Sequence, residues 1–415
     1  MRRSLIAQML FPLASVALLI SMPGPGRADV MTEWNVIAIN ATAVPPNSIL
    51  QSRVLAIVHG AVYDAVCAVE RKGGSYAVDL KAPAGTSIDA AVAAAAHGTL
   101  MHLAPAQRSM LDAALEATLA KIVNGQSKTD GISIGAQIAE RMLALRSKDG
   151  AGARVAFTPK PGAGQFQLTP PYSMPALLTQ WGGVTPFILR DTGSLEFKGP
   201  PAVTSAEFAR DFDEVKSLGA RNSTTRTADQ TAAAIFWTIQ TGVPWYAAAR
   251  AASTAKGLSV SENARLFALL AMATADSQIV GFAEKYRRPH WRPITAIRAA
   301  ANLDIPTLRG DANWEPLLVT PQHPEYPSAH AIYSGAAEAV LRAFFGSDAV
   351  NVTVTYPGPF GHSRSYGRFS EITEEVDNAR VWGGIHFRSA DTHGSELGRK
   401  IGTIVTRDFP KPKVN

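Results

Sequence analysis

Two histidines stand seven residues apart in the stretch HPEYPSAHA, at His323 and His330. Two prolines oppose a helix before Ser328 and the following residues favour one, so Ser328 is predicted to cap a helix whose first turn carries Ala329 and His330. A helix N-terminus presents free N–H groups and a positive dipole end, which attract anions and disfavour protonation of His330. Small Ala329 would let an oxyanion approach the backbone. The pattern therefore indicates an oxyanion site, with an ordinary capped helix and a surface histidine as the alternative.

A second stretch, KYRRPHWRP, carries Lys285 and Arg292 seven residues apart. Pro289 and Pro293 predict one helix that ends near Arg288 and another whose first turn includes Pro293. Taken alone, this stretch is better explained as a solvated basic helix end.

A third stretch, ARVWGGIHFRSAD, places Arg380 six residues before His386 across Gly383 and Gly384. The two glycines predict a helix that loosens before the histidine. Alone, this histidine would be assigned a structural role. However, six of the nine histidines lie between His290 and His393, so the three stretches are best considered together.

Together the stretches resemble, in order and spacing, the signature of vanadium-dependent haloperoxidases and the related type 2 phosphatidic acid phosphatases: KxxxxxxRP, PSGH and SRxxxxxHxxxD. The matching residues are Lys285, Arg292, Pro293, Pro327, Ser328, His330, Arg380 and His386. Ala329 replaces the glycine of the second part, and Ala379 replaces the serine of the third. The resemblance is close over residues 227–408, and the N-terminal half is similar to secreted bacterial haloperoxidase-like proteins through VHGAVYDAV and WGGVTPF.

The resemblance implies a binding site for vanadate, in which phosphate can take the same place. Its oxygens would be held by the side chains of Lys285, Arg292, Ser328 and Arg380 and by the Ala329 amide. Three cations nearly balance a dianion or trianion, as the burial of charge requires. The alanine keeps its N–H, so this hydrogen bond survives the departure from glycine.

The resemblance also implies roles for the histidines. His386 would be the axial ligand to vanadium, or the nucleophile on phosphorus in a phosphatase, and His330 the acid–base partner on the opposite side. Asp391 follows His386 by five residues where the signature has four, so we do not expect a strict phosphatase relay between them. His323 falls where chloride-oxidising haloperoxidases carry an aromatic residue and bromide-oxidising ones resemble this sequence. At the pocket mouth it would tune protonation and hold a halide or water; a surface histidine before a proline is the alternative.

The N-terminus predicts export. Arg2 and Arg3 precede an apolar run over residues 5–20, and a small-x-small site ends at Ala28, as in a signal peptide covering residues 1–28. The paired arginines hint at twin-arginine export, and an uncleaved anchor is the alternative. We expect a periplasmic or secreted protein with no membrane span after cleavage.

Composition limits the partners. Removing residues 1–28 takes away three arginines and no acids, so the formal charge falls from +6 to +3 and predicts no nucleic-acid partner. The single cysteine, Cys67, excludes an intramolecular disulfide framework and a cysteine-based zinc site.

The periodicity of apolar residues predicts an all-α fold of packed helical bundles, with no convincing run of alternating strands. After residues 1–28 we expect a helical section over 29–147, a Pro/Gly-rich ordered connection over 148–204 and a helical section over 205–415 that carries the oxyanion site, all from residue 29 onward in one compact unit. Predicted helices of the last section cover residues 205–218, 228–240, 261–285, 294–301, 328–345, 371–381 and 395–408.

Three functions are consistent with the sequence. The first is a vanadate-dependent haloperoxidase that oxidises bromide or iodide with hydrogen peroxide to hypohalous acid. The second is an acid phosphatase that hydrolyses phosphate monoesters through a phosphohistidine. The third is a protein that binds phosphate or vanadate without turnover. The sequence leaves open the organic substrate, a homodimer and which anion is the physiological occupant.

Overall fold

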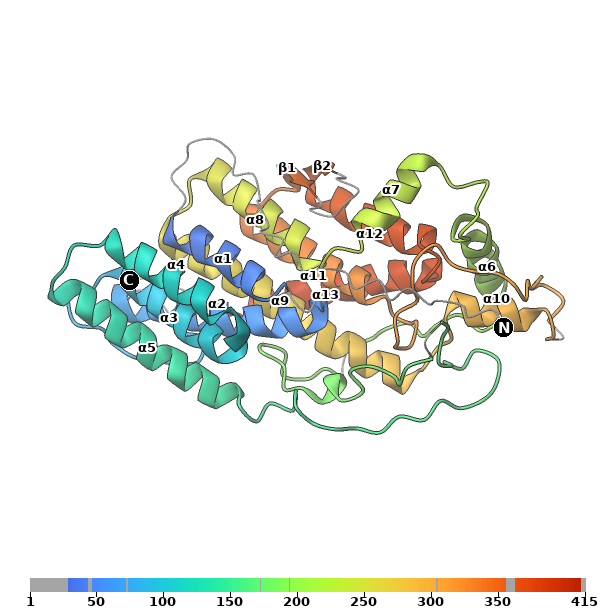
Figure 1. Cartoon of the computed structure of the whole chain (residues 1–415), viewed down its shortest axis with the longest axis horizontal. Helices are drawn as coiled ribbons and strands as arrows, with labels where there is room; N and C mark the ends of the chain where they lie inside the picture. The colour runs from blue at the N-terminus through green and yellow to red at the C-terminus, as the bar shows by residue number, and fades with distance from the viewer. Residues whose placement is uncertain are drawn as a thin grey trace, which may run out of the picture.

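The computed structural model describes residues 29–43, 47–71, 74–171, 173–193, 195–303, 305–355 and 363–411. The expected signal peptide over residues 1–28 lies outside them. Helices dominate the described chain, and Figure 1 shows them packed side by side along the long axis of the molecule. The predicted all-α fold class is confirmed.

The N-terminal helices are α1 (Val30–Ala41), α2 (Ser48–Glu70), α3 (Ile88–Leu103), α4 (Arg108–Ala120) and α5 (Gln126–Arg146). The later ones are α6 (Ala206–Leu218), α7 (Ala228–Phe236), α8 (Gly242–Lys256), α9 (Val260–Arg287), α10 (Pro293–Ala300), α11 (Ala329–Phe345), α12 (Phe369–Trp382) and α13 (Arg388–Asp408). Sequence periodicity did not predict α1 and α8, and α13 begins seven residues before the predicted helix start.

A small antiparallel hairpin of β1 (Ala349–Thr355) and β2 (Ser363–Arg368) was also not predicted. Val350, Val352 and Val354 are buried while their neighbours are exposed, so the alternation that marks a half-buried strand is present in the sequence. Strand β1 is short and closely follows the long helix α11, so its alternation was not recognised beside the helical pattern. The hairpin packs on α8 and α12 and leaves the helical architecture unchanged.

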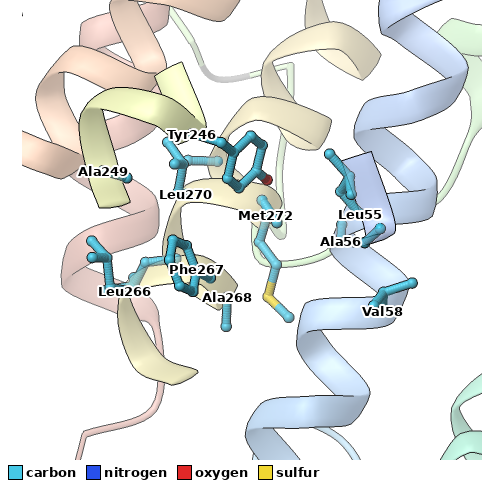
Figure 2. Close-up of a cluster of buried hydrophobic side chains, with 14 of the residues drawn as sticks. Leu55, Ala56, Val58, Tyr246, Ala249, Leu266, Phe267, Ala268, Leu270 and Met272 are labelled. Carbon is cyan, nitrogen blue, oxygen red and sulfur yellow. The ribbon is translucent and has the colours of Figure 1, made fainter. Parts of the chain in front are cut away.

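Helix α9 forms the centre of the fold. A capping box between Ser259 and Glu262 starts it, and Pro289 stops it just after the C-cap residue Arg288. Most residues between its two ends are buried, and Figure 2 shows its apolar side chains between those of α2 and α8. The labelled members of this cluster are Leu55, Ala56, Val58, Tyr246, Ala249, Leu266, Phe267, Ala268, Leu270 and Met272. Full burial of one Leu or Phe side chain contributes roughly 1.5–3 kcal/mol, so this cluster fixes the axis along which α9 runs.

Helices α11 and α13 are held unusually close by glycine. A Cβ on Gly335 would lie 2.1 Å from the Ser395 carbonyl oxygen, and a Cβ on Gly398 would lie 2.2 Å from that of Ile332. Any larger residue at either position would push the helices apart. Because α11 begins with Ala329 and α13 follows His386, this contact sets the distance between two of the three sequence stretches.

The segment between α5 and α6 contains only the 3₁₀ turn η2 (Trp181–Gly183) among its described residues. It is nevertheless well anchored. The buried Asp276 carboxylate of α9 accepts hydrogen bonds from the backbone N–H groups of Phe187, Ile188 and Leu189, at 2.6–2.9 Å. Trp181 is 1% exposed. These contacts hold the connection against the middle of α9.

Two helices, α2 and α9, are long and apolar enough to cross a membrane by length and composition. Their most apolar windows are 78% and 94% buried inside the protein.

Candidate oxyanion site

The three sequence stretches meet at one place in the fold. Lys285 lies in the last turn of α9, and Arg292 is the N-cap residue of α10. Arg380 lies in the last turn of α12, and His386 follows in the turn before α13. The predicted helix end near Arg288 and helix start at Pro293 are both confirmed.

Ser328 caps α11 as predicted, with extended backbone angles and a side-chain oxygen 3.5 Å from the Ala331 N–H that donates to it. Ser328 is fully buried and Ala329 is 8% exposed, so this helix N-terminus lies inside the protein. The alternative of an ordinary surface cap therefore does not describe this end of α11.

The turn that carries His386 depends on Gly384. Its φ is +74°, a conformation that residues with a Cβ rarely adopt, and a Cβ there would lie 2.3 Å from the Gly219 carbonyl oxygen. Helix α12 ends at Trp382 and the chain reverses over Gly383 and Gly384. The predicted loosening of the helix before His386 is confirmed, and it turns the imidazole toward Arg292.

Arg292 is the most highly connected of the three cations. Its Nε donates to the His323 carbonyl oxygen at 3.0 Å, and one terminal nitrogen donates to the Ile385 carbonyl oxygen at 2.7 Å. That nitrogen also lies 3.2 Å from His386 Nε2, and the other lies 3.0 Å from His323 Nδ1. A guanidinium can only donate, so His386 Nε2 acts as an acceptor here. His323 Nδ1 also lies 3.2 Å from the Pro324 carbonyl oxygen, which accepts only, so the tautomer of His323 decides which of its two contacts is a hydrogen bond.

Lys285 is fully buried, and its ammonium donates to three backbone carbonyl oxygens. These belong to Pro324, at 2.8 Å, Glu325, at 3.0 Å, and Pro327. The three donors of the ammonium are thus directed at the turn before α11. To bind an anion directly, Lys285 would have to release one carbonyl, so in this structure it braces the anion site from behind.

Arg380 contrasts with the other two cations. It is 3% exposed, yet its single hydrogen bond within the described chain runs from one terminal nitrogen to the Trp237 carbonyl oxygen at 2.9 Å. Its Nε is buried without a partner among the described residues, and so is Nε2 of His330. Unsatisfied buried donors and acceptors are costly, so these two groups are the ones in this cluster that an added anion could satisfy.

His386 is 2% exposed and is held from both sides. Its Nδ1 lies 2.9 Å from Glu325 Oε1, which also accepts the Phe387 N–H at 3.0 Å. Its Nε2 faces Arg292 as described above. Glu325 itself is fully buried, and its second oxygen lies 3.5 Å from His290 Nδ1, which is long for a hydrogen bond.

The electrostatics of the cluster favour an added anion. Burial lowers the pKa of Arg292 and of Arg380 from 12.5 to about 10. Burial, reinforced by Arg292, holds the pKa of Lys285 well below its ordinary value. Each lowered pKa means that the charged form of the side chain is less stable in the folded protein than in water. An anion bound between the cations would stabilise the charged forms again.

The histidines are held neutral by the same surroundings. Burial lowers the pKa of His330 well below its ordinary value, with Arg380 as the next cause, and burial together with Arg292 does the same to His386. The expected near-neutral His330 thus has a different main cause from the helix dipole. Burial acts to raise the pKa of Glu325, but the nearby imidazoles of His290 and His386, the latter through its hydrogen bond, bring it well below its ordinary value.

A cavity of about 370 Å³ opens onto this cluster. Five of the expected site residues line it, namely His323, Ala329, His330, Arg380 and His386. Lys285, Arg292 and Ser328 lie behind these walls and contribute through their contacts. The rest of the cavity lining consists mainly of neutral polar and apolar side chains, including Gln240, Gln278, Leu177 and Val319.

His323 lies deeper than the sequence suggested. We expected it at the pocket mouth, away from the groups that hold the anion, but it is 8% exposed and in direct contact with Arg292. Its ring also packs on Phe282, with ring centroids 5.2 Å apart. The reason is that the turn over residues 323–327 folds inward onto Lys285, so a residue before the prolines is buried with it.

Asp391 does not hydrogen-bond to His386, in line with the doubt raised by its spacing. It is fully buried, and burial together with Asp377 raises its pKa well above the ordinary value, with Ser328 acting in the opposite direction. Sequence reasoning missed Glu325, which takes the position next to His386. The signal was present, because the only acid within HPEYPSAHA is this glutamate.

Comparisons with known proteins relate this chain to vanadium-dependent haloperoxidases. A family model described as the VCPO second helical-bundle domain matches residues 265–411. The vanadium chloroperoxidase of Curvularia inaequalis is 28% identical over a match that covers 35% of this chain and 29% of that protein. The chain therefore matches less than a third of this relative's length.

Solved structures are similar over nearly the whole chain. The crystal structure of a bacterial vanadium-dependent iodoperoxidase has a TM-score of 0.77 at 25% identity, covering 91% of this chain and 95% of that one. A bacterial vanadium-dependent chloroperoxidase, in its apo form, has a TM-score of 0.72 at 17% identity and covers 89% of this chain and 95% of that one. At that identity the second likeness concerns the fold alone.

Proposed function

We propose that this chain, a relative of the vanadium-dependent haloperoxidases, is an exported enzyme that uses vanadate to oxidise bromide or iodide with hydrogen peroxide to hypohalous acid. The observation that carries the proposal is the unpartnered, buried polar surface at the end of the cavity. Arg380 Nε and His330 Nε2 lack partners there among the described residues, beside cations whose charge is penalised by burial. This donor set fits an oxyanion of high charge.

Arg380 would bind the anion's oxygens directly, together with the backbone N–H groups at the start of α11. Lys285 and Arg292 would add charge and hold the walls. His386 Nε2 would supply the lone pair that ligates vanadium, a pair now directed at Arg292. When bound, vanadate supplies a Lewis-acid centre that activates hydrogen peroxide toward a halide.

His330 would handle the proton. Oxidation of one halide by one hydrogen peroxide consumes one proton and releases hypohalous acid and water. A neutral imidazole at the cavity wall can receive a proton at Nε2 and give it up there, and general acid–base groups typically contribute roughly 10²–10⁴-fold. His323 would act on the same step from beside Arg292.

Bromide or iodide is favoured over chloride for two reasons. His323 is an imidazole where the resemblance associates an aromatic residue with chloride oxidation. The similar bacterial structure at 25% identity is described as an iodoperoxidase.

The acid phosphatase is the second candidate, and one contact supports it. A nucleophilic His386 would need a carboxylate on Nδ1, and Glu325 lies there at 2.9 Å. The same cations would hold a phosphate monoester.

One purified sample of the mature protein separates the candidates. We expect oxidation of bromide and iodide that appears only when orthovanadate is added, with little release of phosphate from p-nitrophenyl phosphate in its absence. Phosphate release that vanadate inhibits, with no halide oxidation, would favour the phosphatase. Binding of either anion without turnover would favour the binding protein. N-terminal sequencing of the exported chain should begin at Asp29 if the signal peptide is cleaved as proposed.

A further inference from the structure

His386 is positioned by a carboxylate that comes from a different part of the chain than the signature suggests. Glu325 lies three residues before Ser328, in the turn that Lys285 braces, whereas the acid of the third motif would follow His386. Glu325 is fixed at several points. Its backbone N–H donates to the His290 carbonyl oxygen at 3.0 Å, and its own carbonyl oxygen accepts from Lys285. These contacts fix the backbone of Glu325, and the Phe387 N–H, which donates to the same carboxylate oxygen that faces His386, holds the side chain.

The contacts at the two ring nitrogens of His386 agree with each other on where the proton lies. A carboxylate accepts from Nδ1–H on one side, at 2.9 Å, and a guanidinium faces Nε2 on the other, at 3.2 Å. Both contacts require the same tautomer, with the proton on Nδ1 and the lone pair on Nε2. Carboxylate–histidine pairs of this kind orient metal-ligating imidazoles and raise their basicity.

We propose that Glu325, rather than Asp391, is the positioning residue for His386, and that it orients the Nε2 lone pair toward the oxyanion cavity. His290 supports it from the far side, since its ring is packed among Phe208, Trp291 and Phe387 with Nδ1 3.5 Å from the second carboxylate oxygen. This inference deepens the proposed function and rests on it for the role of His386.

Comparing the binding of vanadate and of phosphate distinguishes a positioning role of Glu325 from a general structural role. Vanadate can take a bond from His386, whereas phosphate at rest is held by charge and hydrogen bonds alone. Removing the negative charge of Glu325 from beside Lys285 and Arg292 should leave phosphate binding unchanged or tighter. Losing the orientation of His386 should weaken vanadate binding. The ratio of the two dissociation constants, vanadate over phosphate, is thus expected to rise roughly 10–100-fold in Glu325→Leu and by less in Glu325→Gln.

The matched control is Asp391→Asn. It replaces another buried carboxyl of the same region, one that makes no hydrogen bond to His386, with a neutral amide of nearly the same size. The ratio of dissociation constants is expected to stay within about twofold of wild type in this variant. A shift as large as that of Glu325→Leu would overturn the assignment of Glu325 over Asp391.

A second measurement needs no vanadate. In ¹⁵N-histidine-labelled protein, the Nδ1–H of His386 should give a downfield proton resonance that exchanges slowly with water and disappears in His386→Gln. It should be lost in Glu325→Leu, kept but less downfield in Glu325→Gln, whose amide oxygen can still accept, and unchanged in Asp391→Asn. Absence of this resonance from wild type, or its persistence in Glu325→Leu, would refute the inference. If wild type binds no vanadate, the proposed function fails while this resonance still tests the Glu325–His386 contact.

Discussion

Replacing Arg380 by methionine should make the anion-free protein more stable and strongly weaken anion binding. Burial lowers the pKa of Arg380 from 12.5 to about 10, which corresponds to a penalty of roughly 3 kcal/mol on the charged form in the folded state. The folded pKa is below the unfolded one but well above 7, so at neutral pH the group is charged in both states and the whole penalty is present. The penalty is relieved progressively as pH rises from about 10 toward 12.5.

Arg380→Met removes this penalty and costs one hydrogen bond, to the Trp237 carbonyl oxygen. The expected net change is an increase of about 1–2 kcal/mol in the free energy of unfolding at pH 7 without anion. Anion binding should weaken by about 2–5 kcal/mol, or about 30- to 4000-fold in the dissociation constant, because the guanidinium with the most unused donors is lost.

Urea unfolding, followed by tryptophan fluorescence with and without orthovanadate, measures both effects. Wild type should gain about 2.7 kcal/mol at a vanadate concentration 100 times its dissociation constant, and Arg380→Met should gain less than about 1 kcal/mol at the same concentration. Arg146→Met is the control, since Arg146 is equally buried but paired with Asp149 and two carbonyl oxygens, and its loss should destabilise the protein. The reasoning is refuted if Arg380→Met behaves like Arg146→Met, or if it binds vanadate as tightly as wild type.

Three further substitutions test other parts of the account. His330→Ala should leave vanadate bound but slow halide oxidation by roughly 10²–10⁴-fold. If the variant instead lost vanadate binding but kept its rate at saturating vanadate, His330 rather than His386 would be the residue that holds vanadium. His323→Phe should change the halide preference or the pH profile of oxidation. It should also alter vanadate affinity several-fold, because Arg292 loses its contact with the His323 ring. Unchanged profiles in both assays would make His323 a bystander. His59→Gln should reduce acid destabilisation of the anion-free protein, because burial, with Arg250 as a lesser cause, lowers the pKa of His59 from 6.5 to about 3. In wild type, the free energy of unfolding is independent of His59 titration above pH 6.5. It falls as the pH drops from 6.5 toward 3, because the unfolded chain binds a proton that the buried ring refuses, and the loss is about 3 kcal/mol at pH 4. The measurement is the drop in urea midpoint from pH 7 to pH 4 in each protein. An equal drop in wild type and His59→Gln would contradict the assignment of this acid sensitivity to His59.

The sequence predicted local features whose causes are themselves local. Proline ended α9 and began α10, Ser328 capped α11, and two glycines ended α12, because steric limits and caps act over a few residues. The three-part motif likewise named the residues that the fold brings together. It did so through resemblance, since nothing in the spacing of Lys285, Ser328 and His386 requires them to meet in space.

Features that depend on long-range packing were not predictable in this way. Glu325 reaches His386 only because the turn before α11 folds inward onto Lys285, which also buries His323. The direction of the Lys285 ammonium, toward three carbonyl oxygens, follows from the same turn. Spacing along the chain gave reason to doubt Asp391 as the partner of His386, but only the tertiary structure identifies Glu325 in its place.

The most direct test of the account is a crystal structure of the protein loaded with orthovanadate, with an anomalous difference map for vanadium. We expect one vanadium per chain at the end of the cavity, bonded to Nε2 of His386, with its oxygens within hydrogen-bond distance of Arg380. Vanadium bound elsewhere, or an empty cavity in which Arg292 still faces Nε2 of His386 at saturating vanadate, would contradict it.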